Sequence, residues 1–148
     1  MSRASATTVV PGRAAVAEEL WYDRHRWPAW IDGFGHVVKL EGDWPQVGAR
    51  LVWESPPKGR GRVQERVTAY EPRVGQTVEV EDERLRGTQT VRFEPVGDEV
   101  RVTLMLDYEL KERNVLTPLL DPLFIRRELG DSLRRTLARF AHERRAEL

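Results

Sequence analysis

One acidic residue falls on a face of a predicted strand that is otherwise apolar. Residues 61–70 read GRVQERVTAY, and the two-residue period of a strand places alternate side chains on one face. The inward set is Val63, Glu65, Val67 and Ala69. A carboxylate there loses water and must be paired or protonated. Glu65 is therefore the best candidate for a catalytic or ligand-contacting group, with a slipped register and a structural ion pair as the alternatives.

An arginine interrupts a second apolar surface near the end of the chain. Residues 116–147 predict one long amphipathic helix. Its apolar stripe comprises Leu119, Leu123, Ile125, Leu129, Gly130, Leu133, Leu137, Phe140 and Ala141. Arg126 falls inside this stripe, where an unpaired buried guanidinium is very costly. Our hypothesis is that Arg126 approaches Glu65 across a cavity and that both hold a polar group of a mostly apolar ligand.

A plainer interpretation of the same helix residues stays open. Arg126 can extend along the apolar surface to reach water at the rim. Gly130 costs about 1 kcal/mol against Ala in a helix, and it makes room either for a ligand or for a closely packed strand. The apolar start of the helix, which includes Leu123, suits the mouth of a pocket or the contact of a homodimer.

Several kinds of chemistry have no residues to perform them. The chain contains no Cys, which excludes disulfides, thiolate metal sites and a cysteine nucleophile. His25, His36 and His142 lack the spacing of metal ligands. Neither a nucleophile elbow nor a phosphate-binding glycine loop occurs. We expect no metal and no cofactor.

Length and charge limit the class of protein. The 148 residues fit one domain over residues 1–148, with residues 1–6 as a loose tail. Lys+Arg and Asp+Glu both number 24, so no global field attracts nucleic acid. No run is long enough to span a bilayer, and the N-terminus lacks a signal-peptide core. We expect a cytoplasmic protein with no nucleic-acid partner and no stable membrane insertion.

The order of predicted elements indicates an α+β fold. A first strand at residues 7–10 precedes two short helices at 14–22 and 23–31. Six strands follow at 36–41, 49–55, 61–70, 76–81, 88–94 and 99–110, all joined by links short enough for antiparallel hairpins. We expect a curved antiparallel sheet of about seven strands wrapped around the long C-terminal helix, with a cavity between them.

Strand periodicity also predicts which side chains face that cavity. In residues 99–110 the inward set includes Leu104, Leu106 and Tyr108, and Gln89 and Trp53 lie on the inward faces of their strands. Trp27 and Trp30 are either core wedges or residues of the cavity mouth, and for Trp53, Gln89 and Tyr108 ordinary core packing is the stronger interpretation. The predicted ligand contacts are Trp27, Trp30, Trp53, Glu65, Val67, Gln89, Leu104, Leu106, Tyr108, Leu123, Arg126 and Gly130.

The ordered set of elements and short motifs resembles a known superfamily. The motifs are Pro11 with the helix ending at Asp23, then RWPAWI at 26–31, VVKLEG at 37–42 and VGAR at 47–50. They resemble the START-like helix-grip superfamily, also called SRPBCC, and within it the polyketide cyclase/dehydrase and lipid-transport group. The resemblance implies a helix-grip fold with an internal cavity for lipids, quinones, hormones or polyketides, and only some members are enzymes. Glu65-Arg66-Val67 resembles a ligand-contacting motif of plant hormone receptors in the superfamily.

We therefore expect a protein that binds a small hydrophobic ligand such as a lipid, a quinone or a polyketide-like molecule. A polyketide cyclase or dehydratase is the first alternative, and a protein that engages ribosomes or delivers quinone is the second. The chain departs from the aromatase-type cyclases of the family. It has Gln64 and Arg66 where they carry tryptophans and Tyr70 where their pocket arginine is expected, which favours non-catalytic binding.

Overall fold

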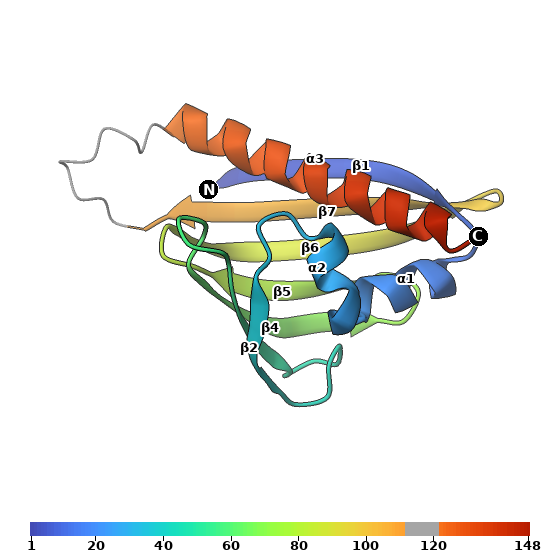
Figure 1. Cartoon of the computed structure of the whole chain (residues 1–148), viewed down its shortest axis with the longest axis horizontal. Helices are drawn as coiled ribbons and strands as arrows, with labels where there is room; N and C mark the ends of the chain where they lie inside the picture. The colour runs from blue at the N-terminus through green and yellow to red at the C-terminus, as the bar shows by residue number, and fades with distance from the viewer. Residues whose placement is uncertain (112–121) are drawn as a thin grey trace.

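A computed structural model describes residues 1–111 and 122–148 (Figure 1). The chain begins with β1 (Ser2–Pro11), followed by α1 (Ala14–Tyr22), the 3-10 turn η1 (Arg24–Arg26) and α2 (Trp27–Trp30). Six strands follow, and α3 (Pro122–Ala146) ends the fold. The strands are β2 (His36–Glu41), β3 (Arg50–Glu54), β4 (Arg62–Glu71), β5 (Gly75–Glu81), β6 (Leu85–Val96) and β7 (Glu99–Leu110).

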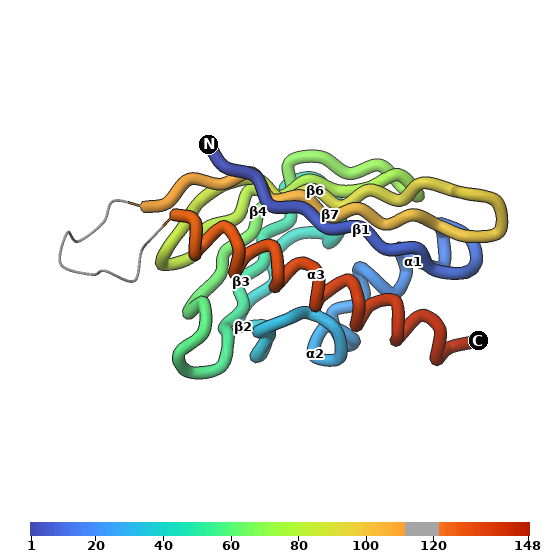
Figure 2. The backbone as a smooth tube through the Cα atoms, turned by 90° about the horizontal axis from the view of Figure 1, so that it is seen from above, coloured from blue at the N-terminus to red at the C-terminus, as the bar shows by residue number. Residues whose placement is uncertain are grey.

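All seven strands form one antiparallel sheet in the order β1-β7-β6-β5-β4-β3-β2. Strands β2 to β7 form a meander in which each strand pairs with the next. The last strand, β7, also pairs with β1. Helix α3 runs along β1 and β7 with α2 on its other side (Figure 2). This arrangement confirms the predicted α+β architecture, with the helices covering one face of a curved sheet.

The expectation of a loose tail over residues 1–6 is wrong. Ser2 to Ala6 belong to β1, where Ser2 pairs with Tyr108 and Ala4 with Leu106. Small side chains have low intrinsic strand propensity, so the sequence alone carries little signal here. The ladder of β7 supplies the pairing, and Ala4 is buried against the core.

The prediction of which β4 side chains face inward is correct as far as Val67 and wrong beyond it. Val63 and Val67 are buried, but the register between β4 and β5 changes between Val67 and Ala69. This irregularity leaves Ala69 exposed, which corrects its predicted inward position. Val67 packs in a small separate cluster with Ala49 and Val78.

Helix α3 buries most of the predicted apolar stripe. The buried members are Ile125, Leu129, Gly130, Leu133, Leu137, Phe140 and Ala141. Pro122 is the first helical residue, where its missing N–H costs nothing; the predicted start at residue 116 lies outside the described residues. Leu123 is 70% exposed and Arg126 is also exposed, because this end of the buried face is narrower than the predicted stripe.

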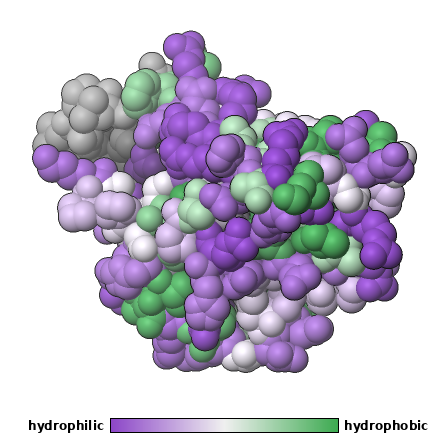
Figure 3. All heavy atoms as spheres, turned by 45° about the vertical axis from the view of Figure 1, so that its right-hand side comes forward, coloured by the Kyte–Doolittle hydropathy of each residue, from purple (hydrophilic) through white to green (hydrophobic). Residues whose placement is uncertain are grey.

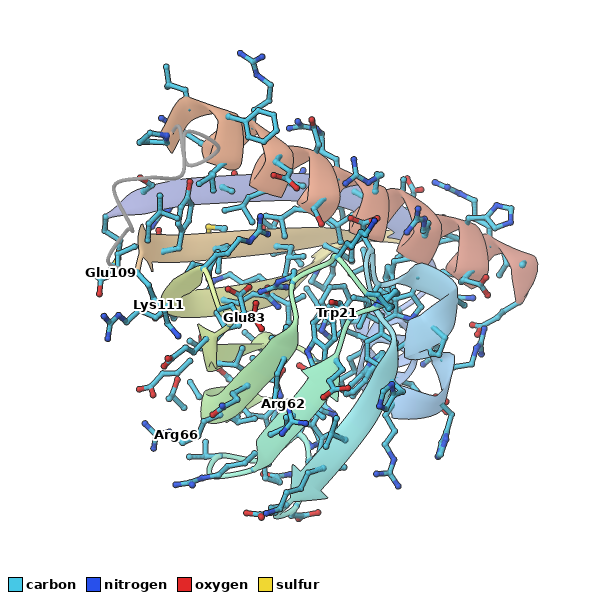
Figure 4. The ribbon with its side chains drawn as sticks, turned by 60° about the vertical axis from the view of Figure 1, so that its left-hand side comes forward. Trp21, Arg62, Arg66, Glu83, Glu109 and Lys111 are labelled. Atoms are coloured by element: carbon cyan, nitrogen blue, oxygen red, sulfur yellow. The ribbon has the colours of Figure 1, made fainter. Side chains whose placement is uncertain are left out.

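Aromatic side chains fill the space between the sheet and the helices. Trp21 of α1 lies between these layers in Figure 4, with its ring centroid 4.6 Å from that of Trp30 and 5.2 Å from that of Phe140. Trp30 and Phe140 are 5.1 Å apart. Such tilted and edge-to-face contacts stabilise aromatic cores beyond their burial alone. They fix α1 and α2 against α3.

One face of the molecule carries both polar and apolar side chains (Figure 3). Figure 3 shows a face on which hydrophobic side chains form groups separated by hydrophilic ones. In the described part of the chain, no helix is long and apolar enough to cross a membrane.

Replacing Gly130 with Ala should stabilise the fold. The nearest neighbours of a methyl group built there are atoms of the Arg134 guanidinium at 3.5 to 3.8 Å, which is ordinary van der Waals contact. Removing a mid-helix glycine should then raise the free energy of unfolding by about 0.5–1 kcal/mol. Urea denaturation followed by circular dichroism measures this difference.

The same change at Gly87 is the matched control. A methyl group at Gly87 would collide with the backbone of Asp107 and Tyr108, so Gly87→Ala should destabilise the protein. An unchanged or lower stability of Gly130→Ala would show that α3 packs too tightly at this position to admit a methyl group.

Candidate functional site

A cavity of about 80 Å³ lies between the inner face of the sheet and the helices. Side chains from α1, α2, α3 and strands β3 to β7 line it, together with Trp44 and Arg60 from two turns. Its lining comprises Trp21, Trp27, Trp30, Ile31, Asp32, Trp44, Leu51, Trp53, Arg60, Glu65, Gln76, Val78, Gln89, Val91, Leu104, Ser132, Leu133 and Thr136. All five tryptophans of the chain are among these residues.

The sharp turn after α1 positions two of these tryptophans. Helix α1 ends at Tyr22, and the Asp23 carboxylate accepts a hydrogen bond from the His25 backbone N–H at 3.0 Å, which caps η1. The chain then enters α2, whose two ends are Trp27 and Trp30. Trp27 Nε1 donates to the Trp21 carbonyl at 2.8 Å. This anchored turn directs both indoles into the interior.

Trp30 differs from Trp27 in its polar atom. The residue is 1% exposed, and its indole N–H is buried without an acceptor among the described residues. A buried donor without a partner is uncommon in folded proteins. Trp30, which lines the cavity, therefore has an unused hydrogen-bond donor.

Glu65 enters the cavity from β4 and is held by Trp53 of β3. The Trp53 indole N–H donates to Glu65 Oε2 at 2.8 Å. Burial raises the pKa of Glu65, and this hydrogen bond and the charge of Arg60 offset part of that rise. Glu65 is half-buried, and the Trp53 indole is its hydrogen-bond partner among the described residues.

Arg60, which the sequence analysis did not single out, supplies the cation next to Glu65. It comes from the turn between β3 and β4, where strand periodicity gives no orientation. Its Nε donates to Asp82 Oδ2 at 2.8 Å, and its guanidinium carbon lies 5.5 Å from the centroid of the Trp53 ring. Its Nη2 is buried without an acceptor among the described residues.

Asp32 closes the cavity at the turn after α2. Its carboxylate accepts hydrogen bonds from Ser132 at 2.7 Å, Arg135 at 3.0 and 3.1 Å, and Arg139 at 3.1 Å. Its backbone N–H donates to Thr136 Oγ1 at 3.0 Å. Burial alone would raise the pKa of Asp32, but the hydrogen bonds from Arg135 and Ser132 and the arginine charges hold it below its usual value. Asp32 thereby fastens the α2–β2 turn to α3.

The structure brings six of the predicted contact residues to this cavity. They are Trp27, Trp30, Trp53, Glu65, Gln89 and Leu104. Leu106 and Tyr108 are buried in the same core without lining the cavity, and Val67 lies in the separate cluster. The cavity residues that the prediction omitted include Asp32, Ser132 and Thr136, which contact each other only after the chain has folded.

The predicted pair of Glu65 and Arg126 does not form. Arg126 is exposed and borders a separate surface groove of about 390 Å³ between α3 and β1, together with Leu123 and Gly130. The helical wheel placed Arg126 within the apolar stripe, but this position of α3 is rotated toward solvent. The arginine near Glu65 is Arg60.

A larger groove of about 640 Å³ lies on the outer face of the sheet. Charged side chains line it, and several form ion pairs, including Arg66 with Glu79 at 2.9 Å and Lys111 with Glu81 at 2.6 Å. In Figure 4, Arg62 and Arg66 project from β4. Exposed pairs of this kind mark a solvated surface, so the inner cavity is the better candidate site despite its smaller volume.

In residues 1–111 and 122–148, no group of three or more His, Cys, Asp or Glu side chains is arranged to hold a metal ion.

One family model matches most of the chain, and several solved structures share its fold. The model of the family described as polyketide cyclase/dehydrase and lipid transport matches residues 1–143. A START superfamily protein from Mycobacterium smegmatis is similar with a TM-score of 0.75 and 16% identity, covering 99% of both chains. The TTHA0849 protein of Thermus thermophilus gives 0.73 and 19%, again covering 99% of both chains. Norcoclaurine synthase from Thalictrum flavum gives 0.61 and 16%, covering 89% of this chain and 83% of the other. No curated protein matches the chain.

Replacing Glu65 with Gln should change how stability depends on pH. Because the folded pKa of Glu65 is raised above its ordinary value of 4.5, the folded protein binds this proton more tightly than the unfolded chain does. Binding of this proton stabilises the folded protein fully when the pH is below the pKa of Glu65 in the unfolded chain. This contribution is lost as the pH rises through the pKa of Glu65 in the folded protein. Relative to wild type, Glu65→Gln should therefore gain stability in urea denaturation as the pH rises above 4.5.

Glu54→Gln is the control with the opposite sign. The hydrogen bond from Arg62 holds the pKa of Glu54 below its usual value, so this variant should lose stability relative to wild type as the pH rises. Parallel pH curves for wild type and Glu65→Gln would contradict a buried, proton-binding Glu65.

Proposed function

Because the chain belongs to the polyketide cyclase/dehydrase and lipid transport family, we propose that it binds a small hydrophobic ligand in the cavity between the sheet and α3. The supporting observation is an aromatic interior in which a few polar groups converge. Glu65, Gln89 and Arg60 reach a space that five indole rings and several aliphatic side chains also line. The remaining polar residues of the wall are Asp32, Gln76, Ser132 and Thr136. Apolar pockets with a small number of placed polar groups are typical of small-molecule sites.

The size of the cavity constrains this proposal. Its volume of about 80 Å³ is below the roughly 300–1,000 Å³ of common ligand pockets. Any ligand larger than a few heavy atoms must therefore move the walls apart. The flat indole surfaces favour a planar ring system, such as a quinone or an aromatic polyketide, over a flexible acyl chain.

Filling the cavity should block binding without unfolding the protein. Val91 is a buried cavity-lining residue of β6, and Val91→Phe adds a ring where the ligand would lie. We expect the affinity for the neutral fluorescent probe N-phenyl-1-naphthylamine to fall at least tenfold, which corresponds to about 1.4 kcal/mol. Probe fluorescence and thermal melting measure binding and folding separately.

Val96→Phe is the matched control on the same strand. Val96 is 42% exposed, so the same substitution there should leave probe affinity unchanged. Equal binding by both variants would place the probe outside the cavity and contradict the proposed site.

A cyclase or dehydratase activity is the second candidate, and Glu65 is the observation that favours it. A carboxyl group whose pKa is raised by burial is a stronger base than an exposed one, and it can exchange protons with a substrate. Norcoclaurine synthase, which has a similar fold, is by its name an enzyme. Aldol closure requires removal of a proton next to a ketone, and Glu65 would be the base.

Deuterium exchange tests this proton transfer without knowledge of the natural substrate. The methyl protons of 2-acetonaphthone exchange slowly in heavy water, and catalysis by Glu65 should accelerate the exchange. Since general base catalysis contributes about 10²–10⁴-fold, Glu65→Gln should remove most of the acceleration measured by proton NMR. Exchange that is equally fast with Glu65→Gln, or no faster than in buffer, would contradict a catalytic Glu65.

A further inference from the structure

The cavity wall contains two buried hydrogen-bond donors that have no acceptor in the described part of the chain. One is Trp30 Nε1 of α2, and the other is Arg60 Nη2 of the β3–β4 turn. Both residues line the same cavity. Buried polar atoms are almost always satisfied in folded proteins, and leaving a charged donor unpaired is especially costly. Tyr22, Arg84 and Arg144 also have a buried side-chain atom without a partner among the described residues, but none of them lines the cavity. The two donors that share one cavity are therefore the ones that a ligand could satisfy.

The Arg60 guanidinium is held in place by groups that use only part of it. Its Nε donates to Asp82 at 2.8 Å, and the Asp82 side chain is fully buried. Asp82 is itself fixed, because its other oxygen accepts hydrogen bonds from the backbone N–H groups of Arg84 and Leu85 at 2.8 and 3.0 Å. The Trp53 ring lies against the guanidinium. The free Nη2 is thus preorganised by Asp82 and Trp53 rather than mobile in solvent.

The charges around Arg60 decide which acceptor fits. Asp82 already balances the Arg60 charge, and the Glu65 carboxyl group lies close enough to feel that cation. At the other end of the cavity, Asp32 pairs with Arg135 and Arg139, and neither arginine lines the cavity. A ligand carboxylate would add a negative charge that no free cation offsets among the described residues of the cavity wall, and burying it would be costly. A neutral carbonyl oxygen accepts the same hydrogen bond without adding charge.

We propose that Arg60 recognises a carbonyl oxygen of an uncharged, planar ligand, as in an aryl ketone, a quinone or a cyclic polyketide. This inference rests on the proposed function, since it names the ligand chemistry of the same cavity. Arg60 contacts the oxygen through Nη2, and Trp30 offers its indole N–H to an acceptor on the α2 side. Glu65, which lies on the adjacent strand to Trp53, faces the carbon atoms next to that oxygen.

Two planar probes of matched shape separate the carbonyl contact from hydrophobic binding. They are 2-acetonaphthone and 2-isopropenylnaphthalene, which differ by an oxygen in place of a methylene group. Each is titrated against N-phenyl-1-naphthylamine bound to the protein, and the ratio of the two affinities is compared among variants. Loss of one hydrogen bond to a charged donor should shift this ratio against the ketone by about tenfold or more.

Two substitutions of Arg60 and one control complete the design. Arg60→Met removes every hydrogen-bond donor of the side chain. Arg60→Lys removes the free edge of the guanidinium but keeps a cation that can pair with Asp82. The Lys variant is therefore expected to fold even if the Met variant does not. Arg62→Lys is the control, because Arg62 is exposed and pairs with Glu54 outside the cavity. We expect the affinity ratio of both Arg60 variants to shift against the ketone and the ratio of Arg62→Lys to equal that of wild type.

Three outcomes overturn the inference in distinguishable ways. An affinity ratio that is the same in wild type and both Arg60 variants removes Arg60 as the carbonyl contact. Tighter binding of 2-naphthoate than of 2-acetonaphthone to wild type overturns the preference for an uncharged ligand. If N-phenyl-1-naphthylamine and both probes fail to bind wild type at all, the proposed function fails, and the inference fails with it.

Discussion

The interior of this protein depends on accommodating one carboxyl group among aromatic rings. Glu65 takes a position on β4 between Val63 and Val67, where an apolar residue would pack without penalty. Burial of its charged form is unfavourable, which raises its pKa. The hydrogen bond from Trp53 and the nearby charge of Arg60 offset part of this cost. Glu65 thus adds a polar group to the cavity wall, and Arg60 is held beside it by Asp82.

The walls of the cavity are held by contacts that join distant parts of the chain. Asp32 ties the turn after α2 to Ser132, Arg135 and Arg139 of α3. At the other side, Arg60 ties the β3–β4 turn to Asp82 beside β6. Neither connection belongs to the sheet ladder, so side-chain contacts rather than strand pairing hold these two turns to the fold.

The sequence predicted the parts of this site that follow a regular period. Alternation along β3, β4 and β7 correctly placed Trp53, Glu65 and Leu104 inward. It could not predict Arg60, because a turn has no period and its direction depends on Asp82, a residue 22 positions away. It also misplaced Arg126, since a helical wheel gives the angle between residues but not which part of a broad stripe meets the sheet. The extension of β1 over Ser2 to Ala6 was missed because the partner strand, not local propensity, creates it.

The indole N–H signals of the five tryptophans offer the most direct measurement of the central claim. All five side chains line the cavity, and each gives one resonance in a proton–nitrogen correlation spectrum. The account predicts that titration with 2-acetonaphthone moves several of these signals together, including those of Trp30 and Trp53, in a saturable manner. Saturable binding that leaves all the indole signals unmoved would place the ligand on the surface and contradict a ligand-binding interior.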